Sequence, residues 1–140
     1  MTPLHAVHAE LIAGMHQVCF VKPWNKRAMA ELLAMPGSFG WLDDETAPRG
    51  FVMARRAADE AEILTLLVLP PFRRLGLGLR LLDQVAAQAR SEGAVRLFLE
   101  VASSNQSAIL LYDKASFRQI GRRAGYYAAD TDALLMAKPL

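Results

Sequence analysis

The chain has 140 residues, of which 53% are hydrophobic and 21% charged, and its formal net charge at pH 7 is +2. This length suits a single domain, residues 1–140, and the composition excludes a disordered chain. The basic residues form no run, and the pairs Arg55-Arg56 and Arg122-Arg123 fit solvated strand ends, so no direct nucleic-acid binding is predicted. One cysteine allows no internal disulfide, and no apolar stretch reaches signal or membrane length. We therefore expect a cytoplasmic protein without a membrane partner.

The amino-terminal part predicts a short strand and two helices. Residues 4–7 fit a first strand, and apolar positions recur at helical spacing over residues 8–20. Asn25 suits the N-cap of a second helix, which must end before Pro36-Gly37 because proline cannot continue it.

The same region holds the side chains that metals and nucleophilic chemistry favour. Cys19 lies among apolar neighbours, which favours a buried structural thiol over a nucleophile. His8 and His16 are too far apart for a helical metal pair, no carboxylate completes a set and Cys19 falls on another face, so no metal site is predicted. The third histidine is His5.

Three strands of an antiparallel meander are expected next, over residues 38–42, 50–54 and 61–68. The third is a continuous apolar run, which is typical of a strand covered on both faces. Pro70 and Pro71 end it, because proline donates no hydrogen bond to a sheet.

A basic loop with two glycines follows, and then a helix. Apolar residues recur at helical spacing up to Gly93, which predicts roughly four turns. A helix that begins on Gly76 and Gly78 leaves free N–H groups for an anion, unobstructed by side chains, and Arg73 and Arg74 add positive charge. The spacing fits neither a dinucleotide loop nor a nucleoside-triphosphate loop. A plain glycine-rich turn is the alternative, but the strand, loop and helix together favour a phosphate site.

The remaining chain predicts a parallel strand, a short helix and a closing hairpin. Residues 94–101 form an apolar strand, so residues 61–101 make a right-handed strand-helix-strand crossover. A helix over residues 105–114 follows, with Ser104 or Asn105 as its cap. Two closing strands are expected at residues 117–122 and 133–137.

Glu100 and Tyr112 are the candidates for acid and base chemistry. Glu100 ends an apolar strand, where open α/β sheets have their functional sites, and partial desolvation there raises the pKa of a carboxyl toward the useful range. The sequence equally allows Glu100 to be a surface residue without a catalytic role, at the point where the strand extends beyond the core. For Tyr112, a core tyrosine is the simpler interpretation of the residues alone.

The loop Arg73-Arg74-Leu75-Gly76-Leu77-Gly78 resembles the R/Q-x-x-G-x-G/A pyrophosphate loop of the GNAT superfamily of acetyltransferases. The resemblance implies that acetyl-CoA is the cosubstrate, with its pyrophosphate on the loop amides and its pantetheine arm along the preceding strand. It also implies that the backbone N–H of Val68 is the oxyanion donor. The implied coenzyme-binding residues are Leu67, Val68, Leu69, Arg73, Arg74, Leu75, Gly76, Leu77, Gly78, Leu79 and Asn105.

A second segment, from Leu99 to Tyr112, is similar to the L-E-V-R-x-S-N-x-x-A-x-x-L-Y segment of RimI-type ribosomal-protein alanine N-acetyltransferases. The match implies that Glu100 is the general base, that Tyr112 protonates the departing thiolate and that Asn105 contacts the coenzyme. Further similarities and departures lie elsewhere. Lys22-Pro23-Trp24 resembles the P-W of that family and Gly125-Tyr126-Tyr127 its N-Y-Y, whereas Thr65, Ala102, Ser116 and Gly125 depart from its pattern.

The resemblance implies a GNAT fold of the α/β (α+β) class, with a mixed central sheet of six to seven strands, about four helices and a strand-helix-strand coenzyme-binding core. It implies an N-acetyltransferase for a protein N-terminal α-amine, such as the alanine of a ribosomal protein. One alternative is a small-molecule amine acceptor, for which an acidic pocket near residues 43–45 is expected. The other is a non-catalytic acetyl-CoA-binding module, which has no need of Glu100 and Tyr112. The oligomeric state is not predicted.

Overall fold

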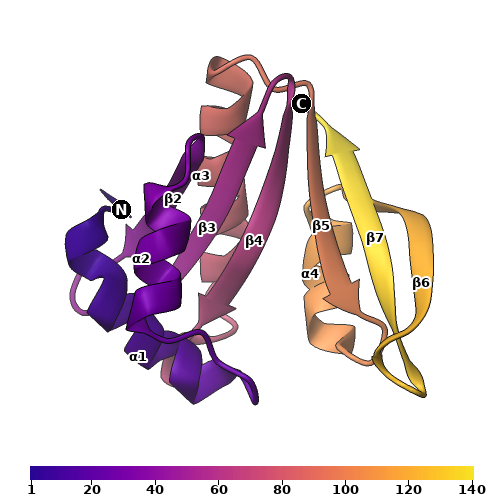
Figure 1. The fold of residues 1–140 in the computed structure, drawn as a ribbon, viewed down its shortest axis with the longest axis horizontal. Helices are drawn as coiled ribbons and strands as arrows, with labels where there is room; N and C mark the ends of the chain where they lie inside the picture. The colour runs from indigo at the N-terminus through magenta and orange to yellow at the C-terminus, as the bar shows by residue number, and fades with distance from the viewer.

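Seven strands, four α-helices and two 3₁₀-helices make up the structure, a computed structural model that describes residues 1–140 (Figure 1). The strands are β1 (Thr2–Pro3), β2 (Ser38–Asp43), β3 (Gly50–Ala57), β4 (Glu60–Val68), β5 (Arg96–Ala102), β6 (Arg118–Ala128) and β7 (Thr131–Pro139). The helices are η1 (Ala6–His8), α1 (Ala9–Cys19), α2 (Lys26–Ala34), η2 (Pro70–Phe72), α3 (Leu77–Ser91) and α4 (Gln106–Lys114).

All seven strands join one mixed sheet in the order β1-β2-β3-β4-β5-β7-β6. Neighbouring strands are antiparallel except β4 and β5, which are parallel and connected through α3. The predicted mixed sheet, its meander and its strand-helix-strand core are confirmed. None of the helices combines the length and the hydropathy that a bilayer crossing requires.

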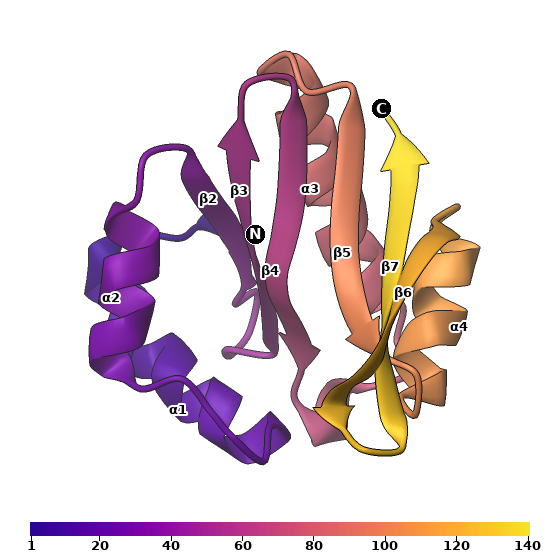
Figure 2. The ribbon, with the colours of Figure 1, turned by 45° about the vertical axis from the view of Figure 1, so that its right-hand side comes forward.

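The parallel pairing of β4 with β5 ends early. It joins residues 60–62 to residues 96–98, after which β4 continues to Val68 without this partner. β5 instead pairs along its whole length with β7. Figure 1 shows β4 and β5 diverging toward their carboxyl ends, and Figure 2 shows β5 running beside β7. We call the region between β4 and β5 the fork. Beyond Glu62, the edge of β4 that faces the fork has no neighbouring strand.

A bulge at Leu64 changes the direction of the side chains along β4. The register against β3 shifts there by one residue. Before the bulge, Ile63 packs with α3 and α4, whereas Leu67 after it packs with α1 and α2. Alternate residues of an unbroken strand would stay on one face. The bulge and the helices on both faces together explain why β4 appears in the sequence as a continuous apolar run.

Helices cover the two faces of the sheet and enclose two apolar clusters. The larger cluster, of 19 buried residues, joins α3 and α4 to the central strands. The smaller cluster, of 9 buried residues, joins α1 and α2 to β2, β3 and β4. No residue of β5, β6 or β7 belongs to the smaller cluster. The face of these three strands opposite α4 is therefore not covered by α1 or α2.

The amino terminus differs from its predicted structure. The first strand is Thr2–Pro3, not residues 4–7, and Ala6–His8 forms a 3₁₀ turn. His8 Nδ1 accepts the N–H of His5 at 2.9 Å. This local hydrogen bond gives the backbone an alternative to strand pairing, which residue propensities do not reveal.

The strand β6 is longer than predicted, because it continues to Ala128 and not only to residue 122. It is the edge strand of the sheet, and its side chains are exposed over almost its whole length. Such a strand has no alternation of buried and exposed residues, which is the pattern on which strand prediction depends.

Leu97 tests the importance of the core beneath the fork. Its side chain is fully buried, so truncation removes apolar contacts and leaves a cavity. We expect Leu97→Ala to lower the free energy of unfolding, measured by urea denaturation, by about 3 kcal/mol. Leu110→Ala, at a position 61% exposed on α4, should change it by less than about 0.5 kcal/mol. Equal losses in the two variants would contradict this assignment of the core.

Candidate active site

β4 leads directly into the loop that the sequence predicts to bind phosphate. After the turn η2, Arg74 and Gly76 adopt left-handed φ angles of 64° and 80°, and α3 begins at Leu77. Six successive backbone N–H groups, from Arg74 to Leu79, donate no hydrogen bond within the chain. They lie at the positive end of the α3 dipole. This arrangement suits the binding of an anion through the backbone.

The two glycines of the loop serve different structural needs. Gly76 has the left-handed conformation, which costs other residues about 1–2 kcal/mol. At Gly78, a Cβ atom would lie only 2.9 Å from Leu111 Cδ2 of α4. Glycine at this second position therefore allows α3 and α4 to approach closely, a packing reason that the sequence interpretation did not include.

Arg73 turns back toward β4 and away from the loop amides. Its Nε donates to the carbonyl of Val68 at 2.9 Å, and its Nη2 lies 3.7 Å from Cys19 Sγ. Arg74 is exposed, and its side chain makes no hydrogen bond within the chain. Cys19, at the end of α1 beside the loop, packs against the smaller core cluster as a structural thiol would, but it is half-buried and not fully buried as predicted. Arg74 is therefore the loop cation that is free to meet a phosphate.

Backbone groups of β4 alternate between β3 and the fork. The N–H of Leu69 donates to the carbonyl of Arg49, in the β2–β3 connection, at 2.8 Å. The backbone N–H and C=O groups of Leu69 and Leu67 therefore point toward β3. Val68 and Leu66 direct theirs toward the fork. Of the three predicted strand contacts, Val68 alone faces the open side. Leu66 shares its orientation, and sequence reasoning missed it because backbone direction depends on register.

Glu100 lies on the face of β5 opposite the larger core cluster, because its strand neighbours enter that cluster. Its side chain is 23% exposed, so it is not a freely solvated surface group. Oε1 of Glu100 lies 3.2 Å from Nη2 of Arg123 on β6. Arg122 and Arg123 are exposed as expected, but they lie within β6 and not at a strand end. Arg123 contacts the candidate base, and Arg122 forms an ion pair with Asp132 across the hairpin.

Tyr112 is a buried residue of α4, with 8% of its surface exposed and its ring edge against Phe117. Burial, and secondly Tyr127, raises the pKa of Tyr112 to about 12, so its hydroxyl keeps its proton at neutral pH. Burial and then the charge of Glu100 raise the pKa of Tyr127. Tyr127 therefore lies near both candidate catalytic residues, close enough for their pKa values to be coupled. Sequence reasoning included it only as part of a tyrosine pair.

Asn105 is the N-cap of α4, as predicted. Its Oδ1 accepts the N–H of Ala108 and the hydroxyl of Ser107, each at 3.3 Å. The cap fixes the start of the helix that carries Tyr112. A contact between Asn105 and the coenzyme stays a prediction.

His16 connects three segments beside the fork. It is 3% exposed on α1, and its Nδ1 accepts the N–H of Trp24 at 3.0 Å. The remaining ring proton is therefore on Nε2, which lies 3.2 Å from Thr65 Oγ1 on β4 and donates to it. The imidazole also stacks between the rings of Phe20 and Trp24. Burial lowers the pKa of His16, so the neutral form is the one that fits this site.

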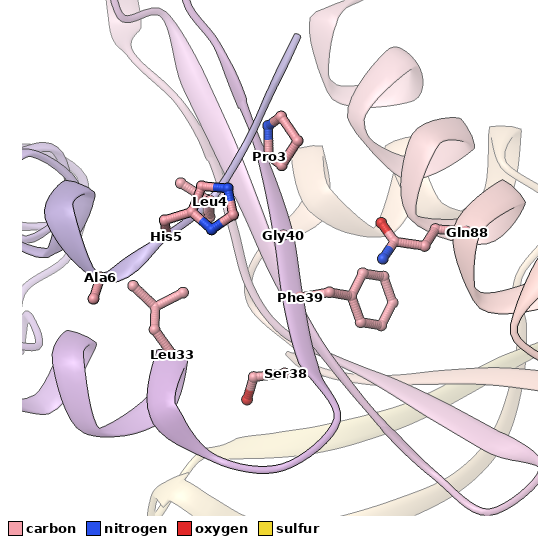
Figure 3. Close-up of a pocket in the computed structure, with 9 residues that line it drawn as sticks. All are labelled: Pro3, Leu4, His5, Ala6, Leu33, Ser38, Phe39, Gly40 and Gln88. Carbon is pink, nitrogen blue, oxygen red and sulfur yellow. The ribbon is translucent and has the colours of Figure 1, made fainter.

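A separate hollow of about 290 Å³ lies near the opposite edge of the sheet, where β1, β2 and α2 meet (Figure 3). Two of its polar groups already have partners: Gln88 Oε1 accepts from Trp41 Nε1, and the hydroxyl of Ser38 donates to Leu32. None of the predicted site residues lines it. The candidate active site is therefore the fork with the adjoining loop.

Comparison with protein families decides the assignment. A model described as the acetyltransferase (GNAT) family matches residues 9–117. The chain belongs to the GNAT acetyltransferase family. As the sequence predicts, it is an acetyl-CoA-dependent N-acetyltransferase.

Individual GNAT relatives resemble most of the chain. It is 37% identical over 101 residues to the [ribosomal protein bS18]-alanine N-acetyltransferase of Salmonella typhimurium, covering 70% of this chain and 67% of the relative. The enzyme of the same description from Escherichia coli K12 is 30% identical over 121 residues, which cover 84% of this chain and 82% of the relative. The crystal structure of the ribosomal-protein-S18-alanine N-acetyltransferase from Escherichia coli has a TM-score of 0.90 at 26% identity, covering 99% of this chain and 91% of that one.

Arabidopsis thaliana NAA60 in complex with acetyl-CoA has the same fold, with a TM-score of 0.86 at 20% identity, covering 99% of this chain and 97% of that one. These comparisons confirm the predicted GNAT fold, with its seven-stranded sheet and four α-helices.

The stability of this GNAT protein should depend on the protonation of His16. Its pKa in the folded state is lowered from an unfolded value near 6.5, so its contribution is fully present above about pH 6.5. Stability should fall as the pH drops from about 7 to 5, because the unfolded chain then binds the proton more strongly. Urea denaturation of His16→Gln should show a weaker pH dependence over this range. His5→Gln, at an exposed position, should behave like the unmodified protein; a slope unchanged in His16→Gln would contradict the assignment.

Proposed function

We propose that this GNAT protein transfers the acetyl group of acetyl-CoA to the N-terminal α-amine of a protein, with the terminal alanine of a ribosomal protein as acceptor. The observation that carries the proposal is the fork. An unpaired backbone edge on β4, suited to the coenzyme, faces a strand that bears the partly buried carboxylate of Glu100. The similarity to bS18-alanine acetyltransferases supports this choice of acceptor. A ribosomal acceptor also fits a cytoplasmic enzyme.

The loop and β4 supply the groups for binding acetyl-CoA. The free N–H groups from Arg74 to Leu79 hold the pyrophosphate, with Arg74 adding charge, and Asn105 contacts the coenzyme from α4. The backbone of Leu66 and Val68 pairs with the pantetheine arm. The N–H of Val68 then stabilises the oxyanion that develops on the thioester carbonyl, a contribution of about 3 kcal/mol.

Glu100 acts as the general base, and the amine attacks the thioester directly. An α-amine has a pKa near 8 and a lysine amine near 10.4, so forming the neutral nucleophile at pH 7 costs about 3 kcal/mol less for the α-amine. A single carboxylate is adequate for this smaller task. The energetic difference favours a protein N-terminus over a lysine side chain.

Tyr112 acts on the leaving group chiefly by hydrogen bonding. Its pKa of about 12 exceeds the value of about 8.5 for a thiol, so complete transfer of its proton would cost about 5 kcal/mol. The hydroxyl of Tyr112 therefore donates a hydrogen bond as the thiolate forms. It releases its proton only as it receives a second proton in exchange. This role needs a tyrosine that stays protonated, which its burial ensures.

The alternative of a small-molecule amine acceptor is disfavoured because the carboxylates of its expected acidic pocket already have partners within the chain. Asp43 and Glu45 both form ion pairs with Arg49, at 2.8 and 3.3 Å. Asp44 accepts a hydrogen bond from the hydroxyl of Thr2 at 2.9 Å. All three carboxylates therefore have partners within the chain, which leaves no free acidic pocket for a cationic small molecule.

Peptide acetylation tests the acceptor. A hexapeptide with a free N-terminal alanine should have a kcat/KM roughly two orders of magnitude above that of the same peptide with a blocked N-terminus and one lysine, following the difference in neutral amine. Mass spectrometry locates the acetyl group. Equal rates, or modification of lysine alone, would contradict the proposal.

Substitution of Glu100 and Tyr112 tests the acid and base roles. Glu100→Gln and Tyr112→Phe should each lower kcat by about 10²-fold or more while leaving the affinity for acetyl-CoA unchanged. Asp113→Asn is the matched control, because this exposed carboxylate adjoins Tyr112 in sequence. Turnover that survives both substitutions would remove these assignments; calorimetry measures the coenzyme affinity independently.

A further inference from the structure

Arg123 reaches the proposed base from two strands away. It lies opposite Ala133 on β7, and Ala133 lies opposite Ala102 on β5. Glu100 comes two residues before Ala102, on the same face of the sheet. Both intervening residues are alanines, so no large side chain separates the guanidinium from the carboxylate. Nη2 of Arg123 and Oε1 of Glu100 are 3.2 Å apart, and both side chains are partly exposed, so this ion pair lies on the face from which an acceptor can reach Glu100.

Arg123 is the one cation that forms an ion pair with Glu100. Burial, and secondly the charge of Glu100, raises the pKa of Glu62 on β4 and of Tyr127 on β6, so these groups also face the base. β7 contributes no charge, since its residue opposite Glu100 is Leu135. Other arginines lie on the same face without an ion pair to Glu100. They are Arg55 of β3, Arg96 of β5 and Arg118 of β6.

A carboxylate base beside an amine has an unwanted electrostatic effect. The acceptor nitrogen needs a free lone pair to attack the thioester, but only about one tenth of an α-amine is neutral at pH 7. The negative charge of a nearby carboxylate stabilises the ammonium ion and raises the pKa of the amine further. A base without a counter-charge would therefore hold its acceptor in the unreactive form.

We infer that Arg123 keeps the bound acceptor amine neutral by offsetting the negative charge of Glu100. A nitrogen bonded to the second oxygen of Glu100 would lie within about 7 Å of the guanidinium, the span of two hydrogen bonds and a carboxylate. At this distance two positive charges still repel each other in a partly solvated site. The ammonium ion therefore releases its proton to water as the amine binds. This inference rests on the proposed role of Glu100 as general base.

The pH dependence of kcat tests the role of Arg123. kcat reports the ionisation of the bound amine, whereas kcat/KM reports that of the free amine. In Arg123→Gln the bound alanine hexapeptide should be mostly ammonium at pH 7, so kcat and KM should both fall by about tenfold while kcat/KM changes by less than about twofold. The difference in kcat should disappear above about pH 10, where the amine is neutral in both enzymes. A merely structural role would lower kcat by the same factor at every pH.

Two further variants separate the charge of Arg123 from its bulk. Arg123→Lys keeps the positive charge and should recover most of kcat at pH 7. Arg118→Gln is the matched control, because it removes an arginine from the same face of β6, opposite Ala137, and its kinetics should match those of the unmodified enzyme. A kcat of Arg123→Gln that is unchanged, or lowered evenly at all pH values, would overturn the inference. A loss in Arg123→Lys equal to that in Arg123→Gln would overturn it as well.

Failure of the proposed function gives a different set of results. Full turnover in Glu100→Gln would refute the proposed base, and the inference with it, whatever Arg123→Gln shows. An unmodified enzyme that acetylates only the lysine peptide would refute the proposed acceptor alone. The difference in kcat caused by Arg123→Gln should then persist to about pH 12, following the lysine amine, and its absence would refute the role of Arg123.

A measurement without turnover tests the ionisation directly. CoA has no acetyl group to transfer, so an enzyme saturated with CoA can bind the alanine hexapeptide without reacting. Nitrogen-15 NMR of a peptide labelled at its α-amine should place the titration midpoint about one pH unit higher in the complex of Arg123→Gln than in that of the unmodified enzyme. The midpoint in the Arg118→Gln complex should equal the unmodified value. Equal midpoints in all three complexes would overturn the inference.

Discussion

The early end of the pairing between β4 and β5 is the constraint on which the rest of the site depends. The bulge at Leu64 follows two residues after the last paired residue, Glu62. A bulge increases the local twist of a strand, which turns β4 away from β5 while β5 remains paired with β7. One extra residue in β4 thus frees a backbone edge, the proposed coenzyme site, and separates it from the strand that carries Glu100, the proposed base.

An open sheet edge normally invites unwanted strand pairing, and here it is limited to a few residues at the fork. The adjoining loop continues the same arrangement, since its N–H groups from Arg74 to Leu79 are also unpaired. Arg73 meanwhile donates to the carbonyl of Val68, which occupies one polar group of this edge. The N–H groups of the loop are therefore preorganised for the proposed pyrophosphate, whereas the proposed pairing of the coenzyme with the Val68 carbonyl requires Arg73 to release it.

Local signals predicted the parts of this arrangement that adjacent residues determine. Asn25 and Asn105 cap their helices as expected, and the apolar run, prolines and glycines located β4, its loop and α3. The partners of Glu100 could not be found in this way. Its contact with Arg123 joins β5 to β6 across the intervening strand β7. No pattern in the sequence between the two residues indicates this contact. Prediction failed where the geometry depends on the register between distant strands.

The departure at Thr65 illustrates how such distant contacts can explain a local difference from the family pattern. Relatives of the RimI type carry asparagine there, whereas the threonine hydroxyl in this chain accepts from His16 Nε2. The same imidazole receives the backbone N–H of Trp24, so its two nitrogens join α1, the connection to α2 and the segment of β4 just after the bulge. A charged imidazole could not accept from Trp24. The pair His16 and Thr65 therefore connects α1 to the residue beside the bulge only while His16 is neutral, the form that burial favours by lowering the pKa of His16.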